Sequence, residues 1–376
     1  MDEEFRNNTL LPILKAGLEL PTEPITAPID VELLAEVGRR QAILPILLHG
    51  MKRLDVRGEA LERIEQLSMN DLYQFAYRDY AVEHICKCFE AAQIPYVLLK
   101  GATLRELYPE QWMRTSSDID VLIHEEDIDT AAVALEKHTD FRKCERHYHD
   151  VLFKNEKICL ELHFSIMETM EKADPLLKRV WEYCERTEGA WRYAMRPAFQ
   201  VFHTTAHMAY HLTHGGLGIR PYLDLWLLRH RTAFDAEEAA ALCESAGLGT
   251  FYEAACRLAD AWLSDGEQTA LTCSLENLCF DGGVFGNSQN AAALGIRGRG
   301  KLGFLLHRLF PPRSTMEEQY PAVKKHLLLL PFYYVRRLLE GLVKKRKSSV
   351  DQLRRVRRAK LDEIRSMDEL MQRLEL

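Results

Sequence analysis

The sequence predicts an α+β protein in which a small mixed β-sheet and its helices are flanked by an N-terminal and a larger C-terminal helical region. Apolar residues recur at helical spacing up to about residue 92, alternate with polar residues between Tyr96 and Phe164, and return to helical spacing from about Pro175. At 376 residues the chain also exceeds the size at which one core usually stops growing. The predicted segments are an N-terminal helical region (1–92), the sheet-containing core (93–172), a C-terminal helical region (173–335) and a basic amphipathic helical tail (336–376).

Composition and charge are those of an ordinary soluble protein. Apolar residues make up 47% and charged residues 28% of the chain, and the net charge of −7 gives no overall attraction to nucleic acid or anionic membranes. No apolar run approaches the roughly 18 residues of a transmembrane helix, and the acidic N-terminus lacks a signal-peptide pattern. The nine cysteines include no Cys-x-x-Cys pair, which favours free thiols. We therefore expect a cytoplasmic protein without a transmembrane segment.

The N-terminal region is predicted to contain short helices followed by a long one. Apolar residues at helical spacing occur in 10–14, 31–37 and 43–48. A longer helix is predicted from about Asn70, a suitable N-cap, to Ala92.

The spacing of apolar residues changes at Tyr96, where the core begins. Alternation with a period of two predicts strands, and turn residues mark their ends. The predicted elements are a strand at 96–99, a short helix at 103–108, a loop at 111–117, a strand at 118–123, a helix at 126–138, extended segments at 141–146 and 149–154, and a strand at 158–164. From about residue 175 onward the chain is predicted to be helical, including 203–214 and 222–230.

Acidic residues occupy one face of two predicted strands. Asp118 and Asp120 alternate with apolar residues, so both carboxylates project from the same face. Glu161 and His163 alternate with leucines in the same way in the later strand. If the two strands are neighbours, three carboxylates meet, and such a cluster can hold two Mg²⁺ ions for an in-line phosphoryl displacement. Taken alone, Asp-x-Asp is equally compatible with a solvated strand edge.

Lys100-Gly101-Ala102 lies where a buried strand is predicted to break into a helix. Backbone N–H groups at the helix start and the lysine charge can bind a polyphosphate at such a place. Arg114, four residues before Asp118, could supply a second cation to the same anion. The alternative for Arg114 is a loop arginine in water.

Three motifs occur together in this region, and they are Leu98-Leu99-Lys100-Gly101-Ala102, Arg114-x-x-Ser117-Asp118-Ile119-Asp120, and Leu160-Glu161-Leu162-His163. They resemble the signature of the uncharacterised bacterial nucleotidyltransferase family within the DNA polymerase β-like superfamily. The resemblance extends from about residue 40 to 345, and its later part includes His207-x-x-x-His211, Arg220 to Asp224, and Pro311-Pro312. One departure is Ala102, because the superfamily often has a serine there whose hydroxyl contacts a phosphate.

The resemblance implies a nucleotidyltransferase that depends on Mg²⁺ (or Mn²⁺) and uses an NTP as substrate. By this resemblance Asp118 and Asp120 bind the ions that bridge the triphosphate, and Glu161 completes the ion that activates an acceptor hydroxyl. A nucleoside monophosphate passes to the acceptor and pyrophosphate is released. The positions that hold the nucleotide are Lys100, Gly101, Ala102, Arg114 and Ser117. The alternative is a non-catalytic nucleotide-binding or antitoxin-like regulatory protein with the same fold.

The histidines near these motifs have several interpretations. His203, His207 and His211 fall on one stripe of a predicted helix and lack the glutamate of the zincin motif. A packed histidine face, a wall of the acceptor pocket and the zinc site of a helical metalloenzyme therefore remain open. The strand histidines are either half-buried packing residues or neighbours of the reaction centre. The candidate acceptor pocket comprises His149, His163, His207, His211, Arg220 and Asp224.

The segment 336–360 holds eleven basic and two acidic residues at amphipathic helical spacing. A solvated helix face, contact with RNA and attachment to an acidic partner are the alternatives for it. Residues 295–300 predict a mobile loop, or a lid that carries Arg297 and Arg299 over a bound triphosphate. The sequence leaves the acceptor open among small molecules, RNA and proteins.

Overall fold

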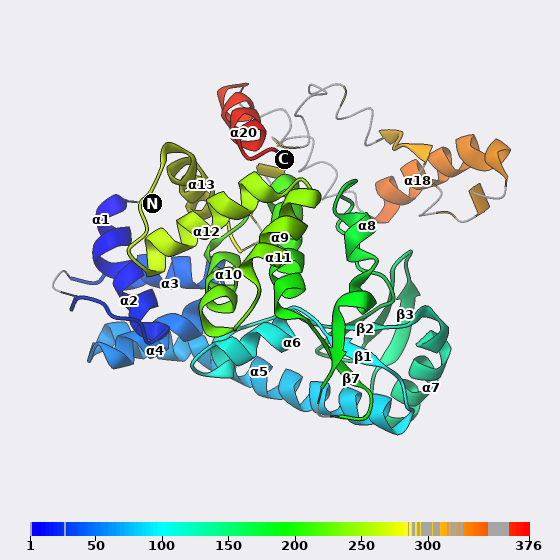
Figure 1. The fold of residues 1–376 in the computed structure, drawn as a ribbon, viewed down its shortest axis with the longest axis horizontal. Coiled ribbons are helices and arrows are strands. Elements are labelled where there is room, and N and C mark those ends of the chain that lie inside the picture. Colours follow the sequence, from blue (N-terminus) through cyan, green and yellow to red (C-terminus); the bar gives the residue numbers. More distant parts are fainter. Residues whose placement is uncertain are drawn as a thin grey trace.

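Helices surround one mixed β-sheet in the computed structural model of the chain (Figure 1). The structure describes residues 2–25, 28–187 and 189–284, scattered positions between 286 and 323, and residues 326–344 and 361–376. The α-helices are α1 (Glu3–Phe5), α2 (Leu11–Gly17), α3 (Val31–Arg40), α4 (Leu44–Arg53), α5 (Glu59–Ala91), α6 (Gly101–Leu104), α7 (Ile128–His138), α8 (Asp174–Leu177), α9 (Pro197–His214), α10 (Ile219–Arg231), α11 (Ala236–Ser245), α12 (Gly249–Leu263), α13 (Ala270–Asp281), α18 (Leu330–Lys344) and α20 (Leu361–Arg373). This arrangement confirms the predicted α+β class.

Seven strands of the described chain form the sheet. They are β1 (Tyr96–Leu98), β2 (Asp118–Ile123), β3 (Arg142–Arg146), β4 (Asp150–Lys154), β5 (Cys159–His163), β6 (Cys184–Arg186) and β7 (Arg192–Met195), in the order β3-β4-β5-β2-β1-β7-β6. The β2–β5 and β1–β7 pairs are parallel, and the other neighbours are antiparallel. The two strands with the acidic motifs are therefore direct neighbours, as the convergence of carboxylates requires.

Two predictions about secondary structure were wrong. Helix α5 begins at Glu59 rather than at Asn70, so it is one continuous helix of 33 residues. The chain after residue 175 is not wholly helical, because β6 and β7 lie there and β7 pairs with β1. These strands have three and four residues, which is too short for a period-two pattern to stand out, and β1, the partner of β7, lies nearly a hundred residues earlier in the chain.

The sheet separates two hydrophobic clusters. Val121 and Leu162 point toward α5 and α7 and join one cluster. Leu122 points to the opposite side and joins a larger cluster built from both the N-terminal helices and α9–α13. Because side chains alternate along a strand, Asp120 and Glu161 share the side of Leu122. The acidic residues therefore face the helical side of the sheet rather than the α5 side.

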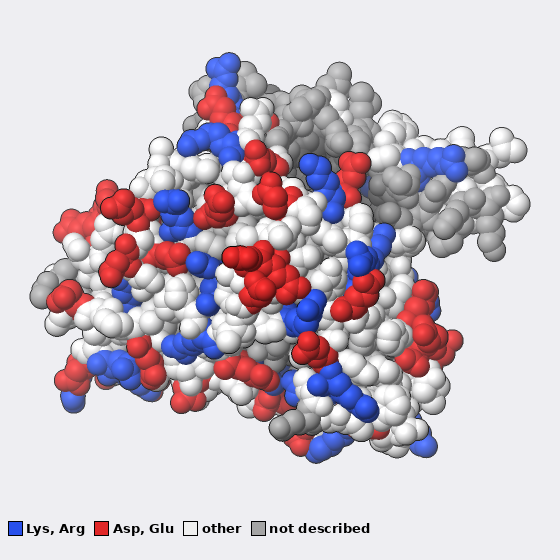
Figure 2. Space-filling view, viewed as in Figure 1, with Lys and Arg blue, Asp and Glu red and all other residues white. Residues whose placement is uncertain are grey.

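In Figure 1, α5 runs along the lower edge and connects the N-terminal helices with the sheet. Figure 2 shows basic and acidic side chains intermixed over the described part of this face. None of the described helices combines the length and the apolar composition that a membrane-crossing segment requires. Residues 295–300 and the 345–360 part of the predicted basic tail lie outside the described residues. The role of the tail therefore stays a prediction.

Candidate active site

A cavity of about 760 Å³ lies between the sheet and helices α9 and α10. Of the residues singled out from the sequence, its wall contains Lys100, Gly101, Arg114, Ser117, Asp118, Asp120, His149, Glu161, His163, His207, His211, Arg220 and Asp224. Ala102 is instead buried in α6. The fold thus brings together side chains from two strands, two helices and the loops between them. Their individual roles stay predictions.

The register of β2 and β5 places Asp120 beside Glu161. Asp120 is buried, whereas Glu161 is half-buried at the cavity wall. One ligand atom each from Asp120, Glu161 and His163 lies within 4.8 Å of the other two. Asp118 lies two residues earlier on the same face of β2, at the wall of the same cavity. Two carboxylates and an imidazole thus converge on one point, with a third carboxylate at the start of the strand.

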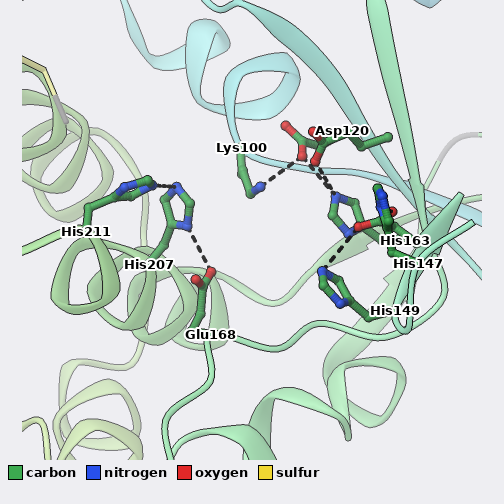
Figure 3. Close-up of polar contacts among 10 residues, drawn as sticks. Lys100, Asp120, His147, His149, His163, Glu168, His207 and His211 are labelled. Carbon is green, nitrogen blue, oxygen red and sulfur yellow. Dashed lines mark hydrogen bonds and ion pairs between the residues drawn. The ribbon is translucent and has the colours of Figure 1, made fainter. Parts of the chain in front are cut away.

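Two hydrogen-bond donors stabilise the ionised form of Asp120. Its Oδ1 accepts hydrogen bonds from Lys100 Nζ at 2.8 Å and from His163 Nε2 at 2.9 Å (Figure 3). Burial by itself would raise the pKa of Asp120, but the charge of Lys100 and the His163 hydrogen bond outweigh it and hold this pKa well below its usual value. Burial, and then the charge of Asp120, raises the pKa of Glu161. A divalent cation fits this donor set, because it would relieve the repulsion between the two carboxylates.

The turn that carries Lys100 is conformationally strained. Lys100 has φ 45° and ψ −116°, which is a rarely populated region for a residue with a side chain. Gly101 follows at a close approach of two loops, since a Cβ there would lie 2.9 Å from the Cβ of Ser116. This backbone directs Lys100 onto Asp120 rather than into open solvent. Whether Lys100 also binds phosphate stays a prediction.

Replacing Lys100 with Met should destabilise the protein. The buried Asp120 would lose its cationic partner, and breaking a buried ion pair by removing one partner typically costs about 3–5 kcal/mol. The Lys100 side chain is 26% exposed, so we expect a smaller loss of about 1–3 kcal/mol. Urea unfolding at pH 7 measures it, and Lys154→Met, at an exposed lysine on β4, is the control. Equal stability of the two variants would contradict the assigned ion pair.

Two predicted phosphate contacts have other partners in the structure. The Ala102 amide donates to the Leu99 carbonyl at 3.2 Å. Arg114 Nε donates to both carboxylate oxygens of Asp224, at 2.8 and 3.0 Å, and the Tyr108 hydroxyl donates to the same carboxylate at 2.7 Å. The nearby Arg220 donates through Nη1 to the Thr115 carbonyl at 3.1 Å. This buried network fixes the loop that leads into β2, so it positions the acidic strand.

A second polar group faces the carboxylates across the cavity (Figure 3). His207 Nδ1 lies 2.8 Å from Glu168 Oε1, and His207 Nε2 lies 3.1 Å from His211 Nε2. Burial would raise the pKa of Glu168, but the hydrogen bond and charge of His207 lower it to about 2. Sequence patterns missed Glu168, because it lies in the irregular segment between β5 and α8 where no periodicity marks a residue. Glu168 and His207 therefore form a carboxylate–imidazole pair at the cavity wall.

The metal-binding interpretation of the α9 histidines has little support. Among the described residues, the groups of three whose ligand atoms converge are Asp120, Glu161 and His163, and also His149, Asp150 and His163. The α9 histidines belong to neither group. Burial lowers the pKa of His203 and of His211 to about 3, so both are neutral at pH 7.

Loss of stability in mild acid should follow from these buried neutral histidines. A histidine whose folded pKa lies below its unfolded value of about 6.5 contributes stability above pH 6.5 that is lost as the pH falls toward 3, at about 1.4 kcal/mol per pH unit and proton. His203→Asn removes one such group, so the free energy of unfolding should fall less steeply between pH 6.5 and 4.5. Urea unfolding measured across this range tests the slope. The exposed His138→Asn is the control, and equal slopes in both variants would contradict the prediction.

A comparison with family models matches residues 27–264, more than half of the chain, to a family described as "Uncharacterised nucleotidyltransferase". No curated protein and no solved structure gives a significant match. The matched region contains the whole sheet, the cavity wall residues singled out above, and helices α3 to α12.

Proposed function

The chain belongs to the uncharacterised nucleotidyltransferase family, and from this premise we propose that it transfers a nucleoside monophosphate from an NTP to an acceptor, releasing pyrophosphate. The observation that carries the proposal is the paired register of Asp120 and Glu161 on the wall of the large cavity. We also propose that the family lies within the DNA polymerase β-like superfamily, whose Asp-x-Asp strand and later acidic strand match β2 and β5. All nine cysteines are free in the structure, which supports a reducing, cytoplasmic location.

Asp118, Asp120 and Glu161 are proposed to hold Mg²⁺ or Mn²⁺ together with the triphosphate. Bound divalent cations would neutralise the phosphate charge during an in-line displacement. Asp120 is suited to this because it stays ionised, and Glu161 because it faces the open cavity. Lys100 and the amide of Gly101 lie at the same wall, where a triphosphate would meet them. Ser117 and Arg114 line the adjoining loop.

The acceptor is proposed to bind between the carboxylates and α9. The volume of about 760 Å³ falls in the range of small-molecule sites, which favours a small molecule or a single flexible end of a larger one. His207, backed by Glu168, lines this space, and its Nε2 would exchange the contact with His211 for the acceptor nucleophile and take a proton from it. Arg220 and Asp224 shape the far wall.

Each of the four α-labelled NTPs, incubated with pure protein, a divalent cation and a cell lysate, tests the transfer. We expect one species of the lysate to take the label, and we expect Asp118→Asn to suppress that labelling. If no species takes the label and Asp118→Asn leaves nucleotide affinity unchanged, the enzymatic proposal fails.

A non-catalytic nucleotide-binding protein is the second candidate. The observation that favours it is the 2.8 Å ion pair between Lys100 and Asp120, which occupies one of the proposed ligand oxygens. Measuring NTP binding at equilibrium, together with analysis of the bound nucleotide, distinguishes the enzyme from the non-catalytic protein. A regulator would bind an NTP tightly and return it unchanged, whereas the enzyme would release pyrophosphate in the presence of acceptor.

Glu168→Gln should slow the transfer without preventing NTP binding. The neutral amide removes the charge that stabilises a protonated His207, and we expect about a 10²-fold loss, since positioned acid–base groups contribute about 10²–10⁴-fold. Steady-state rates with the identified acceptor, together with nucleotide affinity, provide the test. Glu171→Gln, at an exposed glutamate three residues later, is the matched control. A full rate in Glu168→Gln would exclude the pair from the reaction.

A further inference from the structure

We propose that His163 is a nitrogen ligand of the cation held by Asp120 and Glu161, and that the site therefore takes a first-row transition ion such as Mn²⁺ in preference to Mg²⁺. The inference rests on the proposed function for the presence of a cation at this wall. The inference adds a nitrogen ligand, because the acidic motif by itself predicts only carboxylate ligands.

The position of His163 on β5 supports this assignment. It lies two residues after Glu161 on the same face of the strand, and the paired register places both beside β2. His163 Nε2 lies 2.9 Å from Asp120 Oδ1 and 3.5 Å from Glu161 Oε2. One imidazole nitrogen is thus directed at oxygens of both carboxylates. When a cation binds, this nitrogen gives up the hydrogen that it donates to Asp120, and the neutral ring carries its proton on Nδ1. The side chain is buried at the cavity wall, so neighbouring groups restrict its rotation.

The next strand places a carboxylate next to His163 that has other histidine partners. The antiparallel register of β4 and β5 places Asp150 opposite His163. Asp150 is buried and held on both oxygens, since His147 Nδ1 lies 2.7 Å from Oδ1 and His149 Nε2 lies 3.1 Å from Oδ2. Asp150 therefore pairs with His147 and His149, whereas the polar contacts of His163 are with Asp120 and Glu161.

The rival group of His149, Asp150 and His163 is less suited to the ion. Both oxygens of Asp150 already have histidine partners, whereas the Lys100 and His163 contacts of Asp120 are both to Oδ1. Asp120 and Glu161 line the cavity through which a nucleotide and its cation would enter. An incoming ion therefore meets the Asp120 group first.

The mixed donor set determines which ion binds best. Mg²⁺ prefers oxygen ligands in near-ideal octahedral geometry and keeps several waters. Imidazole suits first-row transition ions. Mn²⁺, which binds most weakly in that series and shares the carboxylate preference of Mg²⁺, is the most stringent of them as a test of the nitrogen donor. Exchanging one oxygen donor for His163 should therefore shift the preference away from Mg²⁺.

Mn²⁺ titration of the metal-free full-length protein, with Mg²⁺ as competitor, tests the preference by electron paramagnetic resonance. Pulsed measurements also detect a coordinated imidazole through its ¹⁴N coupling to Mn²⁺. We expect this coupling in the wild-type protein and at least about a tenfold preference for Mn²⁺, by analogy with the 10–100-fold effects of residues around metal sites. His163→Asn should lose the coupling and most of the preference, while its Mg²⁺ affinity changes little.

His149→Asn is the matched control, because its ring stacks on His163 at 6.1 Å and belongs to the rival group. It should keep both the ¹⁴N coupling and the preference. Loss of the coupling in His149→Asn, no ¹⁴N coupling in the wild-type protein, or an unchanged preference in folded His163→Asn each overturns the proposal, as does an absence of Mn²⁺ binding with and without NTP. The transfer assay is separate. Intact coupling without transfer of label contradicts the proposed reaction and leaves this ligand set standing.

Discussion

Asp120→Asn is expected to lower nucleotidyl transfer by about 10³-fold, which corresponds to about 4 kcal/mol of barrier. Asp120 is 3% exposed and stays ionised beside Lys100 and His163, so a cation that binds there meets a carboxylate that water screens little. Asparagine keeps the shape of the side chain but removes the charge and one oxygen ligand. Steady-state transfer from α-labelled NTP to the identified acceptor measures the effect.

The chain contains its own control for this substitution. Asp127-Ile128-Asp129 has the same Asp-Ile-Asp sequence as the motif that ends at Asp120. It lies where a short 3₁₀ turn leads into α7, and Asp129 is exposed. Asp129→Asn should therefore leave the rate within about twofold, as expected for a surface change away from the site. If Asp120→Asn keeps more than a tenth of the wild-type rate while folded, Asp120 does not carry the reaction.

Local periodicity predicted which side chains of the two acidic strands share a face. Alternation along 118–123 and 158–164 fixes which side chains share a face, and it does so whatever the pairing partner is. Because both strands turn leucine and isoleucine toward α5 and α7, their acidic residues had to share the other side of the sheet. The convergence of Asp120 and Glu161 followed once the strands became neighbours.

Contacts between distant parts of the chain were not predictable in this way. Arg114 and Asp224 are 110 residues apart, and no local pattern shows that they pair in the interior. Glu168 reaches His207 from a segment without regular structure. Strand β7 joins the sheet by pairing with the edge of β1, and β6 joins it by pairing with β7. These features depend on tertiary packing, which overrides short and weak local preferences.

Asp224→Ala is expected to destabilise the protein by about 3–5 kcal/mol, the usual cost of leaving a buried charge without its partner. Asp224 is 3% and Arg114 is 8% exposed, and the carboxylate also accepts the Tyr108 hydroxyl. In the alanine variant the Arg114 guanidinium and the Tyr108 hydroxyl would lose their carboxylate partner in a site that little water reaches. Arg114 precedes Ser116 and Ser117, so the loop into β2 should loosen as well. Urea unfolding at pH 7 gives the stability loss.

An arginine–aspartate pair that joins α10 to α12 provides the comparison. Arg229 and Asp260 lie 3.2 Å apart, with side chains 21% and 27% exposed, so water can replace the missing partner. Asp260→Ala should cost no more than about 1 kcal/mol, as partly exposed pairs do. Removing both charges of the buried pair with Arg114→Met and Asp224→Leu should recover much of the loss, since no charge is then left unpaired. A cost for Asp224→Ala as small as that for Asp260→Ala would show that the Arg114 network does not hold the loop.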